Sequence, residues 1–232
     1  MSDVIATPAI ARVPVAGSAD TFPVHRIYCV GRNYVEHAIE MGHTGREAPF
    51  FFLKPADAVL PVRAGEVGQM HYPGLTRNLH HEMELVVAIG QGGRHIPAAQ
   101  ALSHVWGYAA GLDMTRRDLQ NEMKKQGRPW CIGKGFEESA PIGPIVPAAQ
   151  VPAVLDAAIE LSVNGQVRQS SRTGKLIWSV AEVIEHLCCA WTLAPGDLIF
   201  TGTPEGVGAV VPGDLLVGRI EGLPELHVRI IE

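Results

Sequence analysis

Short apolar runs alternate along this chain with turns rich in glycine and proline, which is typical of a protein built mainly from strands. Residues 1–25 are expected to form an N-terminal arm, irregular up to about residue 23, and residues 26–232 a single domain. The Asn-Gly pair at 164–165 predicts a hairpin over residues 157–169. Further strands are predicted from apolar runs bounded by turn residues, over 26–31, 48–55, 82–90 and parts of 195–231.

Helical spacing of apolar residues is less frequent. Four segments carry it together with start or stop signals: 33–42, the first part of 96–115, 116–127 and 178–193. Ser179 is a candidate N-cap, with Glu182 at the spacing of a capping box. The helices and strands follow no regular βαβ order, so we predict an α+β, mainly β fold with one core.

Composition limits the class of protein further. Of the 232 residues, 47% are hydrophobic, yet no apolar run approaches the roughly 20 residues that span a bilayer. The net charge of −5 gives no basic surface for nucleic acid, and we expect neither a nucleic-acid nor a membrane partner. The N-terminal stretch has no basic region before an apolar one, so we expect no secretory signal and a cytoplasmic location. The four cysteines form no CxxC pair and are expected to be small buried residues of a reduced protein.

Two glutamates open the predicted strand at 82–90. In an extended strand Glu82 and Glu84 share one face, with their Cβ atoms roughly 6–7 Å apart. Like charges at this spacing repel, and burial would raise the cost, whereas a hard divalent cation removes both problems. Spacing alone also allows an exposed strand face with two solvated glutamates.

A third acid favours the metal site. Asp113 closes an apolar run that is otherwise nearly uncharged, and a lone carboxylate there is unusual unless it is paired or coordinated. Three carboxylates from two segments would make an open site for Mg²⁺ or Mn²⁺. His80 falls on the face of the glutamates, but nitrogen is a poor magnesium ligand, so we expect it beside the site or at the surface.

Two other groups of residues suit chemistry next to a metal. His37 and Glu40 are three apart on a predicted helix, where a carboxylate can orient an imidazole as a general base. An ordinary surface pair is the alternative. Arg117 and Gln120 share a helical face, and Lys134 follows; cationic and amide groups suit an anionic, oxygen-rich substrate. Arginines at a helix start can also simply be solvated.

Taken together, these stretches resemble the fumarylacetoacetate hydrolase family. The resemblance extends over residues 26 to 231 in the family's order. It is carried by the stretches "VGRNYVEHAIEMG", "FFFLKP", "HHEMELVVAIG", "GLDMTRRDLQ", "GRPWCIGKGFEESAPIGP", "VNGQVRQ", "LIFTGTPEGVG" and "GLPELHVRI". It implies a mixed β-roll or sandwich core in a catalytic domain over 26–232, and usually a homodimer.

The resemblance also implies a role for each site residue. The metal ligands would be Glu82, Glu84 and Asp113. The catalytic residues would be His37, Glu40 and Lys134. The substrate contacts would be Arg117, Gln120 and Thr203.

The implied reaction is metal-dependent hydrolysis of a carbon–carbon bond in a 2,4-diketo acid, with Mg²⁺ or Mn²⁺ as cofactor. The expected substrate is fumarylpyruvate, cleaved to fumarate and pyruvate in the gentisate branch of aromatic catabolism. Three alternatives stay open at this point. They are acylpyruvase or oxaloacetate decarboxylase activity, isomerisation of hydroxymuconate-type diacids, and a non-catalytic protein that binds a metal and small acids.

Overall fold

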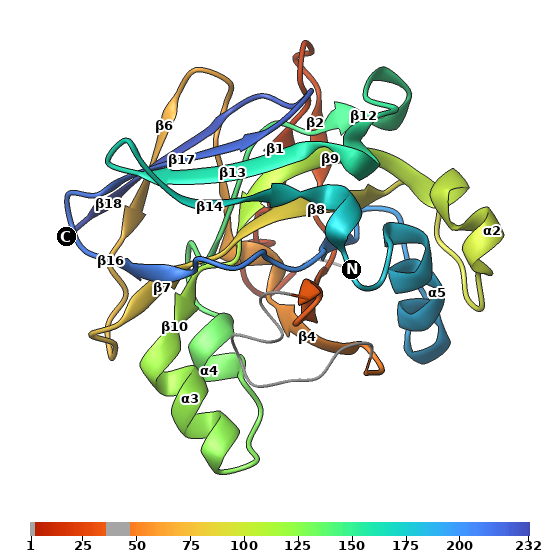
Figure 1. Cartoon of the computed structure of the whole chain (residues 1–232). Helices are drawn as coiled ribbons and strands as arrows, with labels where there is room; N and C mark the ends of the chain where they lie inside the picture. The colour runs from red at the N-terminus through yellow and green to blue at the C-terminus, as the bar shows by residue number, and fades with distance from the viewer. Residues whose placement is uncertain (1–2, 36–46) are drawn as a thin grey trace.

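The computed structural model describes residues 3–35 and 47–232, whose strands form four sheets (Figure 1). The largest sheet has eight strands in the order β4-β3-β15-β8-β9-β11-β5, with β12 paired to β9. Its strands are β3 (Ile27–Gly31), β4 (Phe50–Lys54), β5 (Val59–Pro61), β8 (Met83–Ile89), β9 (Val105–Leu112), β11 (Ala140–Ile142), β12 (Val146–Pro147) and β15 (Leu198–Phe200).

Two smaller sheets adjoin it. One has the order β14-β13-β17-β18-β6 and the other β10-β7-β16. The strands of the first are β6 (Val67–His71), β13 (Ala158–Val163), β14 (Gln166–Arg172), β17 (Leu215–Ile220) and β18 (Leu226–Ile231). Those of the second are β7 (Leu79–His81), β10 (Thr115–Arg116) and β16 (Gly208–Val210).

The helices lie around the sheets in two pairs, α2 with α5 and α3 with α4 (Figure 1). They are α2 (Ala98–Ala101), α3 (Arg117–Lys125), α4 (Cys131–Lys134) and α5 (Val180–Ala190). Short 3₁₀ turns connect other elements: η1 (Ala56–Ala58), η2 (Leu102–His104), η3 (Ala148–Gln150), η4 (Val154–Asp156) and η5 (Thr173–Lys175). Among the described residues, no helix has the length and apolar character needed to cross a membrane.

The central strand β8 is buried on both faces, and the alternation of its side chains explains where Glu82 and Glu84 point. Leu85 and Val87 belong to a large apolar cluster, while Val86 belongs to a second, smaller one on the opposite face. The large cluster lies where β13 packs on β8 and β17 on β9. Because side chains alternate, Glu82 and Glu84 share the face of Val86. The carboxylates therefore extend one edge of the smaller cluster.

The predicted α+β, mainly β fold with a β-roll or sandwich core is confirmed. The strands expected at 26–31, 48–55 and 82–90 are β3, β4 and β8. The hairpin turns at Asn164 and Gly165, whose φ angles of 52° and 78° are those of a two-residue turn. Helix α5 begins with the predicted capping box of Ser179 and Glu182.

Two expectations need correction. The arm is not irregular up to residue 23, because β1 (Arg12–Pro14) pairs with β2 (Thr21–Pro23) and packs on the smaller cluster. Pro14 and Pro23 stand at strand ends, where a missing N–H is tolerated. Cys131 and Cys189 are exposed, unlike the buried Cys29 and Cys188.

Two predictions are left open by the structure. In the helix predicted at 33–42, Tyr34 instead forms an isolated bridge with Leu176, and residues 36–42 lie outside the described residues. The division into an arm over 1–25 and a domain over 26–232 stays a prediction.

Candidate metal centre and active site

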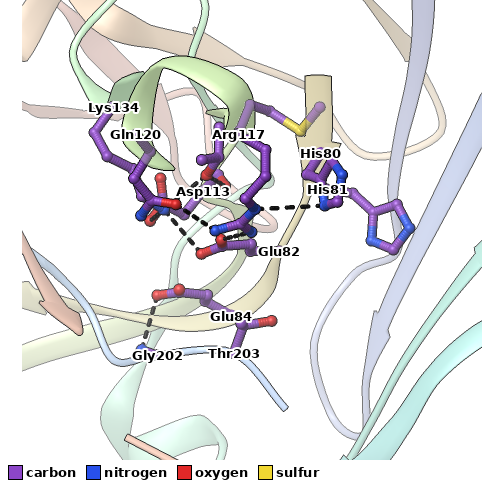
Figure 2. Close-up of polar contacts among 12 residues, drawn as sticks. His80, His81, Glu82, Glu84, Asp113, Arg117, Gln120, Lys134, Gly202 and Thr203 are labelled. Carbon is purple, nitrogen blue, oxygen red and sulfur yellow. Dashed lines mark hydrogen bonds and ion pairs between the residues drawn. The ribbon is translucent and has the colours of Figure 1, made fainter. Parts of the chain in front are cut away.

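Three buried carboxylates converge at the ends of β8 and β9. Glu84 in β8 is paired with Gly111 of β9, and the backbone N–H of Asp113 donates to the carbonyl oxygen of Glu82 over 2.9 Å. One oxygen from each of Glu82, Glu84 and Asp113 lies within 4.8 Å of the others. The predicted shared face is therefore confirmed, and the alternative of solvated glutamates is wrong (Figure 2).

The chemistry of these donors fits a hard divalent cation. Oδ1 of Asp113 is buried and accepts no hydrogen bond among the described residues, although Nζ of Lys54 lies 2.9 Å away. Burial raises the pKa of Glu84 well above its usual range, and the charges of Asp113 and Glu82 raise it further. A cation bound between these oxygens would relieve that cost, so the three carboxylates could hold Mg²⁺ or Mn²⁺.

Lys134 supplies a buried positive charge at the same point. Its Nζ donates to Oδ2 of Asp113 and Oγ1 of Thr115, each over 2.6 Å, and to Oε2 of Glu82 over 2.9 Å. Burial lowers the pKa of Lys134, but Asp113 and Glu82 outweigh that effect and the net shift is upward. Lys134 is therefore charged, and all three of its N–H groups are in use.

Lys54 is a second buried cation, which the sequence reasoning missed. Its Nζ donates to the carbonyl oxygen of Met114 over 3.1 Å and to that of Lys134, besides facing Asp113. A signal was available, because Lys54 closes an apolar run just as Asp113 does. Lys54 is also the last residue of β4, a position that is usually solvated.

Arg117 and Gln120 lie on the opposite side of Glu82. Arg117 is the first residue of α3 and donates to Oε1 of Glu82 and to Oε1 of Gln120. Both side chains are buried, so the predicted common face is confirmed and solvated arginine is excluded at this position. The guanidinium of Arg117 and the amide of Gln120 therefore lie beside the carboxylates that could hold a metal.

His80 lies next to this arginine rather than among the carboxylates. Its Nδ1 is 3.5 Å from Nε of Arg117, and its Nε2 is 2.9 Å from Oδ1 of Asn78. Burial, and then the charge of Arg117, lower the pKa of His80 to about 4. The ring is therefore neutral at pH 7 and can accept from the guanidinium. This agrees with the position expected for it beside the site.

The loop after β15 closes the site on the side of Glu84. The backbone N–H of Gly202 donates to Oε2 of Glu84 over 2.8 Å. Gly202 has a φ of 102°, and a Cβ there would lie 2.7 Å from Cβ of Asn33. Only glycine fits this turn, which also presents Thr203 to the site.

Gln169 of β14 fixes that loop to the strand of the glutamates. Its Nε2 donates over 2.8 Å both to Oγ1 of Thr203 and to the carbonyl oxygen of Pro204. Its Oε1 accepts from the backbone N–H of Met83 over 3.0 Å and lies 3.2 Å from Nδ1 of His81. The side chain is 1% exposed. Sequence reasoning missed it because a glutamine in a hairpin strand usually faces solvent.

Replacing Gln169 with leucine is expected to destabilise the protein by about 2–5 kcal/mol. The change leaves several buried polar partners without a hydrogen bond, at about 1–3 kcal/mol each. Gln166→Leu is the matched control, since Gln166 lies in the same strand but is exposed, and it should stay within about 0.5 kcal/mol of wild type. Urea unfolding measures both. Equal stability of the two variants would contradict the role of Gln169 in fixing the loop after β15 to β8.

One hollow brings the predicted residues together. Of the nine, the structure places seven around it: Glu82, Glu84, Asp113, Arg117, Gln120, Lys134 and Thr203. Val30, Gly31, Arg32, Phe52 and Trp130 complete its described lining. His37 and Glu40 lie outside the described residues, so their position stays a prediction. The roles of all nine likewise stay predictions at this point.

Comparison with known proteins identifies the family. The sequence profile described as "Fumarylacetoacetate (FAA) hydrolase C-terminal" matches residues 26–231. The chain belongs to the fumarylacetoacetate hydrolase family. Within this family, fumarylpyruvate hydrolase from Ralstonia sp is 50% identical over 184 residues, which are 79% of this chain and 93% of that protein.

Two further family members bear on the chemistry. The crystal structure of fumarylpyruvate hydrolase from Pseudomonas aeruginosa in complex with Mn²⁺ and pyruvate superposes with a TM-score of 0.97, at 57% identity and over 99% of both chains. Mitochondrial oxaloacetate tautomerase from Rattus norvegicus is 42% identical over 204 residues, which are 88% of this chain and 90% of that protein.

Proposed function

We propose that this protein is a metal-dependent hydrolase that cleaves fumarylpyruvate to fumarate and pyruvate. The observation that carries the proposal is the buried cluster of Glu82, Glu84 and Asp113, set against Lys134 and Arg117. The similarity to two fumarylpyruvate hydrolases, one of them bound to Mn²⁺ and pyruvate, supports this substrate. The three carboxylates would hold Mg²⁺ or Mn²⁺.

The charges of the cluster suit a dianionic substrate. Glu82 and Asp113 pair with three cations, Lys54, Lys134 and Arg117. With Glu84 counted as a third carboxylate, the described cluster is formally neutral. A divalent ion would add two positive charges, and a diketo acid with two carboxylates would balance them. A neutral substrate would leave that excess charge in a buried site, at a high cost in desolvation.

When bound, the divalent ion supplies a Lewis acid and a template for the substrate. Arg117 would hold a substrate carboxylate, as guanidinium groups do in a bidentate geometry. His37, oriented by Glu40, would take a proton from water, and the resulting hydroxide would attack the C4 carbonyl. Lys134 and Gln120 would stabilise the negative charge on that carbonyl oxygen. The C3–C4 bond then breaks, fumarate leaves, and the three-carbon fragment gains a proton to become pyruvate.

A second candidate activity acts on oxaloacetate at the same site. The similarity to oxaloacetate tautomerase favours it, because both substrates carry a carboxylate next to a keto group. Acylpyruvase or oxaloacetate decarboxylase activity would use the same carboxylates and cations. The cytoplasmic location, the homodimer and the place in gentisate breakdown stay predictions.

The proposal predicts a substrate order and a metal requirement. Purified protein with Mn²⁺ or Mg²⁺ is offered fumarylpyruvate, acetylpyruvate and oxaloacetate in parallel, with loss of the enol absorbance followed and the products separated. We expect fumarate and pyruvate from fumarylpyruvate, with the highest kcat/KM of the three. A chelator should abolish turnover, and added metal should restore it. Turnover of oxaloacetate alone would support the second candidate, and full turnover of metal-depleted protein would contradict both.

A further inference from the structure

A second hollow of about 530 Å³ opens beside the carboxylate site, between β4 and the residues that lead into α4. It shares the lining residues Arg32, Phe52 and Trp130 with the first hollow, so the two are adjacent. Its other walls include Phe50 and Arg128. The carboxylate site is therefore extended on one side by a space that is aromatic along its walls and carries two guanidinium groups.

A row of aromatic contacts leads from the site into this space. Nζ of Lys134 lies 5.0 Å from the ring centroid of Phe52, which is 5.8 Å from that of Trp130. The rings of Trp130 and Phe50 meet edge to face at 5.2 Å, and Cζ of Arg32 is 5.3 Å from the centroid of Phe50. The row runs from a proposed catalytic ammonium to a guanidinium.

Gly31, in the lining of the first hollow, leaves room for the ring of Phe50, which lines the second. A Cβ at Gly31 would lie only 2.0 Å from Cζ of Phe50, so any side chain there would displace the ring. Arg32 follows with a φ of 57°, a left-handed conformation that is uncommon outside glycine. This turn places Arg32 in the lining of both hollows.

We propose that the aromatic hollow binds the acyl half of the substrate, and that Arg32 and Arg128 select acyl chains that end in a carboxylate. The inference rests on the proposed function, because it places the scissile carbonyl at Lys134. A conjugated enoate is flat and apolar along its chain and charged only at its end. Aromatic walls suit the chain, and a guanidinium suits the terminal carboxylate.

The two arginines are expected to contribute unequally. Arg32 is half-buried, so its attraction for a carboxylate is less screened by water, although it also interacts with the charge of Glu47. Arg128 is exposed, and an exposed charge contributes less. A substrate carboxylate would thus depend mainly on Arg32, with Arg128 at the outer rim.

The test compares fumarylpyruvate with acetylpyruvate, whose acyl group carries no charge. Arg32→Gln should lower the ratio of the two kcat/KM values, fumarylpyruvate over acetylpyruvate, by about 10–100-fold, the worth of a hydrogen bond to a charged group. Arg128→Gln should lower it about two- to fivefold, and Arg128→Glu further. The change should appear mainly in KM for fumarylpyruvate, since the distal carboxylate does not react. Arg63→Gln, at an exposed arginine outside both hollows, is the control and should leave the ratio unchanged.

Each outcome bears on a separate claim. If wild-type protein cleaves both acylpyruvates but the ratio is unchanged in Arg32→Gln and in both Arg128 variants, the inference is overturned and the proposed function stands. If the wild type cleaves neither, the proposed function itself fails. If Arg32→Gln does not fold, Arg128→Gln and Arg128→Glu still test the proposal. Reversal of this exposed charge must lower the ratio of kcat/KM for fumarylpyruvate over acetylpyruvate.

Discussion

Glu84→Gln is expected to weaken Mn²⁺ binding by at least about 100-fold without destabilising the metal-free protein. Residues that only orient a metal ligand already contribute 10–100-fold to affinity, so a lost ligand charge should cost at least that much. In the metal-free protein, however, Glu84 is a buried carboxylate close to two others, and it accepts a hydrogen bond from the backbone N–H of Gly202. A neutral amide removes that repulsion.

Asp113→Asn makes the same change of charge but should have the opposite effect on stability. Asp113 lies against Nζ of Lys134 at 2.6 Å and Nζ of Lys54 at 2.9 Å, with all three side chains 0–2% exposed. Removing one partner of a buried ion pair typically costs about 3–5 kcal/mol, because the remaining charge is uncompensated. Metal affinity should fall in this variant as well.

Urea unfolding of metal-free protein and titration with Mn²⁺ together measure both effects. The prediction is contradicted if Glu84→Gln destabilises the metal-free protein as much as Asp113→Asn does, or if either variant binds Mn²⁺ like the wild type.

In the wild type, the raised pKa of Glu84 means that a proton occupies the site at low pH. Metal binding should therefore release a proton and become tighter as the pH rises.

The local features of the fold could be predicted from the sequence. The hairpin at Asn164 and Gly165, the capping box of α5 and the strand β8 each follow from residues that are close in the chain. The face shared by Glu82 and Glu84 also follows from strand geometry alone. Asp113 could be added because a charge at the end of an apolar run is costly unless it has a partner.

What could not be predicted depends on contacts between distant segments. Lys54 reaches Asp113 across 59 residues, and Gln169 reaches Met83 across 86. The arm pairs β1 with β2 despite its prolines, because Val13 and Phe22 gain burial in the smaller cluster. In each case a tertiary partner overrides what the local pattern indicates.

The hydrogen bonds of Lys134 connect the metal site to the proposed chemistry. In the structure its three N–H groups go to Asp113, Glu82 and Thr115, so a substrate oxygen must replace one of them. A divalent ion at Glu82 and Asp113 would compensate their charges in place of the ammonium. Metal binding is therefore expected to precede the use of Lys134 as a donor to the substrate.

His37→Ala is expected to lower kcat for fumarylpyruvate by about 10²–10⁴-fold, the usual contribution of a general base. The described lining of the site contains no histidine. Of its three carboxylates, Glu82 and Asp113 are paired with cations and Glu84 is a proposed metal ligand. A base that titrates near neutral pH must then come from elsewhere in the chain, and His37, with Glu40 to orient it, is the proposed source.

The measurements separate a lost base from a lost fold. Mn²⁺ affinity should stay within about twofold of wild type, because His37 is not a proposed ligand and the three carboxylates are intact. Added imidazole should restore part of the turnover, and Glu40→Gln should show a smaller loss, since the imidazole remains. His71→Ala removes an exposed imidazole outside the hollow and should leave turnover unchanged. Near-full activity of His37→Ala, with the metal site intact, would show that another group activates the attacking water.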